Sequence, residues 1–159
     1  MSMHKTLAMK LLEGKKVTYE VLEYSTSFRD AQEVAAALDI PAGQVFKTLV
    51  VLRPSPAKPM LVMVPADRQL DLKKLAKAVK AKKLKMATYH EAERLTGLQV
   101  GGISALALLN RGFAIFLDES AKALDHVIIS AGQRGLQIKL AVSDLVTVTK
   151  ARFVDAVSE

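Results

Sequence analysis

The chain alternates between stretches with apolar residues at helical spacing and stretches that are apolar at every second or at every position. Each helical stretch starts at a Ser, Thr or Asp that could cap a helix N-terminus. These stretches predict helices over residues 6–13, 30–40, 71–80 and 88–96, and a final helical region from residue 143 or 144 that contains Phe153 and Val157. The other stretches predict strands over residues 17–21, 45–52, 60–65, 84–87, 113–117, 126–130 and 136–140. Gly14 and Gly97 are expected to end the first and fourth of these helices.

The helices and strands are mixed along the chain, with no internal repeat, low-complexity tract or linker between them. The length of 159 residues is close to the commonest size of one domain. We therefore predict a single domain over residues 1–159 of mixed α/β (α+β) class, with a mixed, largely antiparallel sheet.

Composition narrows the classes of function. Lysine and arginine exceed aspartate and glutamate by 23 to 16, a formal net charge of +7 that favours polyanionic partners. The absence of cysteine excludes disulfides, thiol nucleophiles and cysteine-bound metal centres. The three histidines, at positions 4, 90 and 126, lack metal-ligand spacing, so no metal is expected. Apolar runs such as residues 100–109 are too short to span a membrane, and no signal-peptide cleavage pattern follows the N-terminus; we expect a cytoplasmic protein.

Lys47 lies within an otherwise apolar strand. The alternation of residues 45–52 places it on the same face as Leu49 and Val51, where an ammonium group is unfavourable unless it reaches water or an anion. Two interpretations remain open: a lysine whose head reaches water at the mouth of the strand, or a clamp for a phosphate or carboxylate.

Two glycine-rich segments could bind a ligand through their backbone. Residues 97–104 contain Gly97, Gly101 and Gly102, which would allow an acyl carbonyl or an oxyanion to approach bare N–H groups. Residues 130–135 could form an anion-binding nest with Arg134. A structural turn explains either segment equally well. Ser104 has no histidine near it in sequence, so covalent catalysis is not predicted.

Basic residues cluster in the segment that follows Arg68. Acidic residues are missing from positions 72–90, so this charge is not neutralised locally. A solvated helix face and a surface that follows a nucleic-acid backbone are both compatible with the cluster. With 5% aromatic residues and no tryptophan, binding would depend on phosphates more than on base stacking. The expected backbone contacts are Lys73, Lys77, Lys80, Lys82 and Lys83.

Four segments in order, residues 45–49, 69–74, 96–104 and 130–136, together resemble the YbaK/EbsC family. This family comprises freestanding aminoacyl-tRNA deacylases related to the editing insertion domain of bacterial prolyl-tRNA synthetase. The resemblance implies a curved central sheet, no cofactor, and removal of a wrongly attached amino acid from tRNA. It also implies substrate-assisted chemistry, in which the cysteine thiol or a tRNA hydroxyl supplies the nucleophile or base.

The resemblance also suggests roles for individual residues. It places Lys47 at the terminal adenosine and its phosphate, and Gly101 and Gly102 around the aminoacyl group. Further positions matching the substrate pocket are Tyr24, Phe28, Thr48, Ile103, Ser104, Ser130, Gly132, Arg134 and Gln137. Gln137 stands where close Cys-tRNA deacylases have aspartate, and Ala105 stands where the family loop usually has proline.

The leading hypothesis is a trans-editing deacylase that releases cysteine from mischarged Cys-tRNA(Pro). Its expected partners are tRNA and prolyl-tRNA synthetase, with no membrane partner. The first alternative is the same reaction on another small amino acid, namely alanine, serine or threonine. A non-catalytic module that binds tRNA or a synthetase, and a small-ligand regulatory domain, remain as alternatives of a different class.

Overall fold

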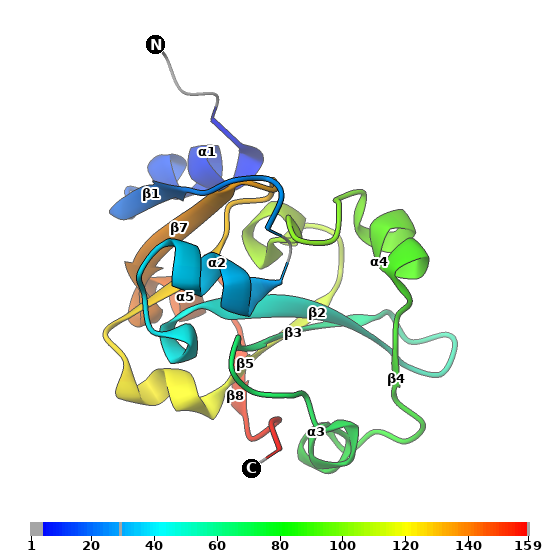
Figure 1. The fold of residues 1–159 in the computed structure, drawn as a ribbon. Coiled ribbons are helices and arrows are strands. Elements are labelled where there is room, and N and C mark those ends of the chain that lie inside the picture. Colours follow the sequence, from blue (N-terminus) through cyan, green and yellow to red (C-terminus); the bar gives the residue numbers. More distant parts are fainter. Residues whose placement is uncertain (1–4, 29, 159) are drawn as a thin grey trace.

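The computed structural model describes residues 5–28 and 30–158, whose strands form two sheets (Figure 1). The three-stranded sheet has the order β1–β7–β6 and is antiparallel throughout; its strands are β1 (Tyr19–Glu23), β6 (His126–Ser130) and β7 (Leu136–Ala141). The five-stranded sheet has the order β4–β2–β3–β5–β8; its strands are β2 (Phe46–Leu52), β3 (Met60–Pro65), β4 (Lys85–Met86), β5 (Ala114–Asp118) and β8 (Arg152–Val154). The β4–β2–β3 part is antiparallel, whereas β3–β5 and β5–β8 are parallel, so the second sheet is mixed.

The α-helices of the described part lie around these sheets (Figure 1). They are α1 (Leu7–Gly14), α2 (Ala31–Ala37), α3 (Leu72–Val79), α4 (Tyr89–Thr96) and α5 (Val142–Thr149). In the same part of the chain, short 3-10 helices connect other elements: η1 (Ala42–Gln44), η2 (Ala105–Leu108) and η3 (Glu119–Ala123). The first four α-helices each begin with a side-chain oxygen that accepts a backbone N–H, from Thr6, Asp30, Asp71 and Thr88. In the described ranges, every helix is too short or too polar to cross a membrane.

The main core lies between the two sheets. One face of β2, with Phe46 and Val50, packs in the same buried cluster as Ile129 of β6 and Ile138 of β7. The opposite face of the five-stranded sheet packs on Leu75 of α3 in a second cluster. A third, smaller cluster includes Ala35 of α2 together with Val45 and Ile128. The alternation predicted for β2 is therefore confirmed, because its odd and even positions serve different clusters.

The two sheets meet beside the start of β2. Val45 and Ile128 form an isolated parallel bridge there, which brings β2 next to β6. Beyond this bridge the outer edge of β2 pairs with no other described strand until β4 pairs with Val51 and Leu52. The gap between bridge and β4 lies next to α2 and α4, and it determines where a ligand could enter.

Three sequence predictions about elements were wrong in detail. Gly14 lies inside α1 and Lys15 is the C-cap, because the left-handed turn falls on Lys16, with φ of 58°. The final helical region ends at Thr149, where Lys150 adopts φ of 58°, and Phe153 belongs to the parallel strand β8. The strands also divide between two sheets, whereas one central sheet was expected.

Candidate functional site

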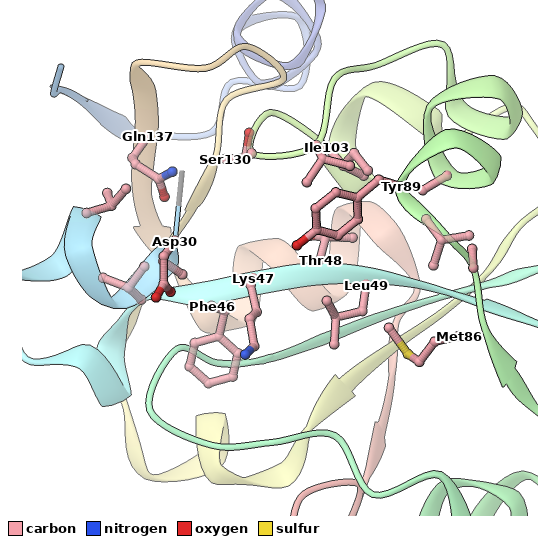
Figure 2. Close-up of a pocket in the computed structure, with 18 of the residues that line it drawn as sticks. Asp30, Phe46, Lys47, Thr48, Leu49, Met86, Tyr89, Ile103, Ser130 and Gln137 are labelled. Atoms are coloured by element: carbon pink, nitrogen blue, oxygen red, sulfur yellow. The ribbon is translucent and has the colours of Figure 1, made fainter. Parts of the chain in front are cut away.

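A cavity of about 250 Å³, which we call the β2 pocket, opens at the gap between the two sheets (Figure 2). The first part of β2 forms one wall. Ser130 and Gln137, which are direct cross-strand partners on β6 and β7, form another. The loop of residues 100–103 and the N-terminal parts of α2 and α4 complete the lining. The pocket thus draws on segments far apart in sequence.

Lys47 and Thr48 present side chains from opposite faces of β2 to this pocket. Thr48 shares its face with Phe46 and Val50, and Lys47 shares the other with Leu49. Both can line one pocket because it lies along the free edge of the strand. Lys47 forms no ion pair with another described residue, so its ammonium is available to an anion.

The backbone of Thr48 also faces the free edge of β2. The carbonyl of Val50 accepts a hydrogen bond from the Ala87 N–H at 3.0 Å, so it points away from β3. Residues two apart on a strand direct their N–H and C=O groups to the same edge. The Thr48 N–H and C=O therefore point toward the pocket, beyond the end of β4, and offer one donor and one acceptor.

Two buried polar atoms in the pocket wall lack a hydrogen-bond partner within the described chain. They are Thr48 Oγ1 and Gln137 Oε1. The Gln137 side chain is only 6% exposed. A buried polar group left unpaired costs about 1–3 kcal/mol, and such groups are rare in folded proteins. Their location in one pocket indicates that a polar ligand or water completes them.

Two side chains hold the loop of residues 100–103 in place. Arg134 Nε donates to the Val100 carbonyl at 2.6 Å, and the Tyr24 hydroxyl donates to the Gly101 carbonyl at 3.5 Å. Gly101 has φ of 94°, in the left-handed region that favours glycine. The carbonyls of this loop are thus turned toward protein donors.

Gly102 allows the two glycine-rich segments to pack closely. A Cβ at this position would lie 2.8 Å from the Arg134 backbone nitrogen and 3.0 Å from the Gln133 carbonyl carbon. The Gly102 N–H donates to the Gln99 carbonyl at 2.7 Å, so it is not free for a substrate. Gly102 therefore shapes the loop from behind the pocket.

The structure brings together some of the expected site residues and separates others. Those that line the β2 pocket are Tyr24, Lys47, Thr48, Gly101, Ile103, Ser130 and Gln137. Those outside its lining are Phe28, Gly102, Ser104, Gly132 and Arg134. Ser104 is fully buried, and its Oγ accepts the Leu106 N–H at the start of η2. Gly132 faces a second cavity on the other side of the turn.

Three residues of the pocket rim were not predicted as site residues from the sequence. Asp30, the cap of α2, is the acidic residue among the described lining residues, and Lys47 is the basic one. Met86 and Tyr89 lie at the other end of the pocket, and the Tyr89 side chain is 76% exposed. An exposed aromatic residue directly after a capping threonine was the signal available for Tyr89. Asp30 gave no signal beyond its role as a cap.

The five expected tRNA-contacting lysines form an exposed group that we call the lysine surface: Lys73, Lys77, Lys80, Lys82 and Lys83. Lys74 lies next to Lys73 on α3 but turns toward the C-terminal segment, donating to the Val157 carbonyl at 3.0 Å. After the lysine surface the chain rises along β4 to α4, and Met86 and Ala87 on this path line the β2 pocket (Figure 1). The chain therefore runs directly from the lysine surface to the rim of the β2 pocket.

The composition of the pocket limits its chemistry. Its described lining contains no histidine, and the chain has no cysteine. In residues 5–28 and 30–158, no three His, Asp or Glu side chains are grouped so that they could hold a metal ion. What the pocket does offer is one cation, one carboxylate, hydroxyl and amide groups, and the exposed backbone of Thr48.

Comparison with known proteins identifies the class. The chain belongs to the aminoacyl-tRNA editing domain family, whose model matches residues 26–148. It is 37% identical over 153 residues to an Enterococcus faecalis protein named "Putative Cys-tRNA(Pro)/Cys-tRNA(Cys) deacylase EbsC", a match that covers 95% of this chain and 92% of the relative. It is also 28% identical over 115 residues to the proline–tRNA ligase of Lactobacillus acidophilus, where it spans 20% of the ligase. The resemblance to the YbaK/EbsC family is confirmed.

Solved structures share the fold over nearly the whole chain. One, described as "a putative trans-editing enzyme for prolyl tRNA synthetase", superposes with a TM-score of 0.82 at 26% identity and covers 96% of both chains. Another, the hypothetical protein APE2540, has a TM-score of 0.87 at 22% identity and covers 96% of this chain. The prediction of a mixed α/β fold of this type is confirmed.

Proposed function

We propose that this aminoacyl-tRNA deacylase releases cysteine from mischarged Cys-tRNA(Pro), with the aminoacyl end of the tRNA in the β2 pocket. The observation that carries the proposal is the pair of buried atoms Thr48 Oγ1 and Gln137 Oε1, which lie in one pocket with Lys47; none of the three groups has a partner among the described residues. An aminoacyl ester next to a phosphate matches this set of groups. The names of the Enterococcus relative and of the trans-editing structure support the choice of tRNA.

The size of the pocket supports a small amino acid. A cavity of about 250 Å³ lies just below the range of pockets that enclose a whole drug-sized ligand. It has room for a small aminoacyl group and part of the ribose, while the rest of the tRNA stays outside. Lys47, half-exposed on the strand edge, is placed to bind the phosphate of the terminal nucleotide.

The proposed chemistry relies on the substrate. With no histidine in the described lining and no cysteine in the chain, the thiol of the bound cysteine supplies the nucleophile. The sulfur attacks the ester carbonyl, the bond to the ribose oxygen breaks, and the thiol proton passes to that oxygen. This gives free tRNA and a cyclic thioester of cysteine, which one water molecule opens to free cysteine. Backbone N–H groups beside the reacting carbonyl, from Thr48 on the strand edge or Gly101 in the loop, would stabilise the developing oxyanion.

A deacylation panel tests the proposal. We expect the rate to fall in the order Cys-tRNA(Pro), then alanyl and seryl esters of the same tRNA, with Pro-tRNA(Pro) unaffected. S-methylcysteinyl-tRNA(Pro) should react no faster than the alanyl ester, because its sulfur carries no proton and is a weak nucleophile. Equal, background rates on every ester would favour the non-catalytic tRNA-binding or synthetase-binding module, whereas deacylation of the S-methyl ester at the rate of the cysteinyl ester would contradict the thiol mechanism.

Partners follow from the same proposal. The lysine surface would follow the acceptor-stem phosphates, since exposed lysines bind the tRNA backbone without reading its sequence. Choice of tRNA(Pro) would then depend on prolyl-tRNA synthetase, which we expect to act together with this protein in the cytoplasm. Adding the synthetase should raise the preference for tRNA(Pro) over another cysteinylated tRNA in the panel.

A further inference from the structure

The charged groups of the β2 pocket are one of each sign. Among the described residues that line it, Lys47 is the basic one and Asp30 the acidic one. They form no ion pair with one another or with another described residue. Two opposite charges that share a pocket without pairing indicate a ligand that itself carries both an anionic and a cationic group.

The carboxylate of Asp30 is fixed in orientation, but only one of its two oxygens accepts a hydrogen bond from a described residue. Its Oδ1 accepts the Gln32 N–H at 3.0 Å, which caps α2 and holds the side chain in one rotamer. Oδ2 has no hydrogen-bond partner in the part of the chain that the structure describes. This oxygen can therefore accept from a ligand while the cap stays intact.

Gln137 adds a second acceptor at the same end of the pocket. Figure 2 shows Gln137 and Asp30 at one end, with Leu49, Met86 and Tyr89 at the other. Gln137 Oε1 is buried without a partner, on a side chain that is 6% exposed. One end of the pocket thus carries two oxygen acceptors that no described residue uses, and the other end is apolar and aromatic.

We propose that Asp30 and Gln137 together bind the α-ammonium of the aminoacyl group. This assignment rests on the proposed function, because the ester of an amino acid carries one ammonium that can donate three hydrogen bonds. Asp30 supplies the charge, and the amide oxygen of Gln137 supplies a neutral acceptor. The ester then lies between this end and Lys47, and the terminal nucleoside lies toward Met86 and Tyr89.

The expected strength follows from exposure. Asp30 is exposed in the free protein, so water screens part of its attraction for the ammonium. The aminoacyl group displaces some of that water, which strengthens a charge-assisted hydrogen bond. We expect the ammonium to improve binding by roughly fivefold to thirtyfold.

The test uses two stable tRNA(Pro) analogues and measures their dissociation constants. One carries cysteine in amide linkage at its 3′ end, and the other carries 3-mercaptopropionate, which keeps the thiol and lacks the amine. Wild-type protein should bind the cysteinyl analogue fivefold to thirtyfold more tightly. In Asp30→Asn, which keeps a capping side chain, most of this ratio should disappear while affinity for the deaminated analogue is unchanged. Gln137→Met should reduce the ratio by a smaller factor.

Asp39→Asn is the matched control. Asp39 is exposed at the other end of α2 with φ of 56°, which asparagine tolerates, and it does not line the pocket. The Asp39→Asn variant changes the net charge as Asp30→Asn does, and it should leave the ratio of the two dissociation constants at its wild-type value. Equal binding of both analogues by wild type, or a ratio unaltered in Asp30→Asn, would overturn the ammonium site. Failure of wild type to hydrolyse Cys-tRNA(Pro) would instead overturn the proposed function.

Discussion

Lys47 is the residue whose removal should separate activity from folding. We expect Lys47→Ala to lower deacylation of Cys-tRNA(Pro) by about a hundredfold or more, because the terminal phosphate loses its cation and the ester its position. The free energy of unfolding should change by less than about 1 kcal/mol, because the ammonium forms no ion pair with a described residue. Single-turnover rates and urea denaturation measure the two effects.

Lys139→Ala is the comparison for this variant. Lys139 lies on a strand, β7, is partly exposed and does not line the β2 pocket. It should retain wild-type turnover. A folded Lys47→Ala protein with full activity would show that the site lies elsewhere, and loss of folding together with activity would assign Lys47 a structural role.

Gln137 is expected to influence how efficiently any aminoacyl ester is deacylated. Its amide is buried against the ligand space, so Gln137→Asp places a carboxylate where a neutral acceptor stood. A charge-assisted hydrogen bond gained or lost there corresponds to about tenfold or more in rate. We expect kcat/KM on the cysteinyl, alanyl and seryl esters to change together by that amount, because all three carry the α-ammonium. A change confined to the cysteinyl ester would show that Gln137 contacts the thiol and not the ammonium.

Single residues differed in how far the sequence could predict them. Strand alternation was enough to identify Lys47 as unusual, and it correctly placed Gln137 on the face opposite Ile138. Asp30 and Tyr89 could not be assigned to the same site, because only the fold brings the start of α2 near the start of α4. The sequence also could not show which backbone groups are already hydrogen-bonded: the Gly102 N–H, expected to face the substrate, donates to the Gln99 carbonyl.

At the scale of elements, a hydrogen bond between α1 and β1 should make the fold sensitive to alkali. The Tyr19 hydroxyl donates to Glu13, and burial, followed by this hydrogen bond, raises the pKa of Tyr19 from 10.0 to about 12. Between these two pH values the unfolded chain loses the proton and the folded chain keeps it. Wild-type stability should therefore fall relative to Tyr19→Phe as pH rises from about 10 to 12.

Urea unfolding of both proteins at pH 8, 10 and 11.5 measures this difference. Below pH 10 the stability difference should be constant, since tyrosine is protonated in both states. Comparison with the variant cancels the titration of lysines and of the other tyrosines. Parallel pH profiles for wild type and Tyr19→Phe would show that Tyr19 titrates alike in the folded and unfolded chain.

Most helices and strands could be predicted from the sequence, because capping residues and apolar spacing depend only on residues close together in the chain. The helix that starts at Thr88 has a complete capping box with Glu91 and ends at Gly97, as the sequence indicated. The same box holds the pKa of Glu91 below its usual value, chiefly through the hydrogen bond from the Thr88 N–H. β8 was missed because its pairing with β5 is non-local, and its three residues carry too little pattern to distinguish a strand from a helix.

At the scale of the whole molecule, the lysine surface should determine how binding depends on salt. Changing Lys73, Lys77 and Lys80 to glutamine should flatten the slope of log K against log salt by about 2, if each lysine contacts one phosphate. Different tRNAs should lose affinity about equally, because phosphate contacts do not read sequence. Filter binding at several salt concentrations measures the slope.

A second triple variant controls for net charge. Lys10, Lys15 and Lys150 are exposed on other elements, and changing them to glutamine lowers the charge by the same amount. Its slope should remain close to that of wild type. Equal slopes for the two triple variants would mean that tRNA does not follow the lysine surface.

Because the β2 pocket lies at the junction of two sheets, a ligand bound in it would contact both sheets and connect them. In the described chain, the strand pairing between the sheets there is the bridge from Val45 to Ile128, whereas the pocket walls come from both β2 and β7. A bound aminoacyl end would fasten the sheets to one another. Amide hydrogen exchange should then slow in both sheets together when the cysteinyl analogue binds, and slowing confined to β2 would show that the ligand contacts a single sheet.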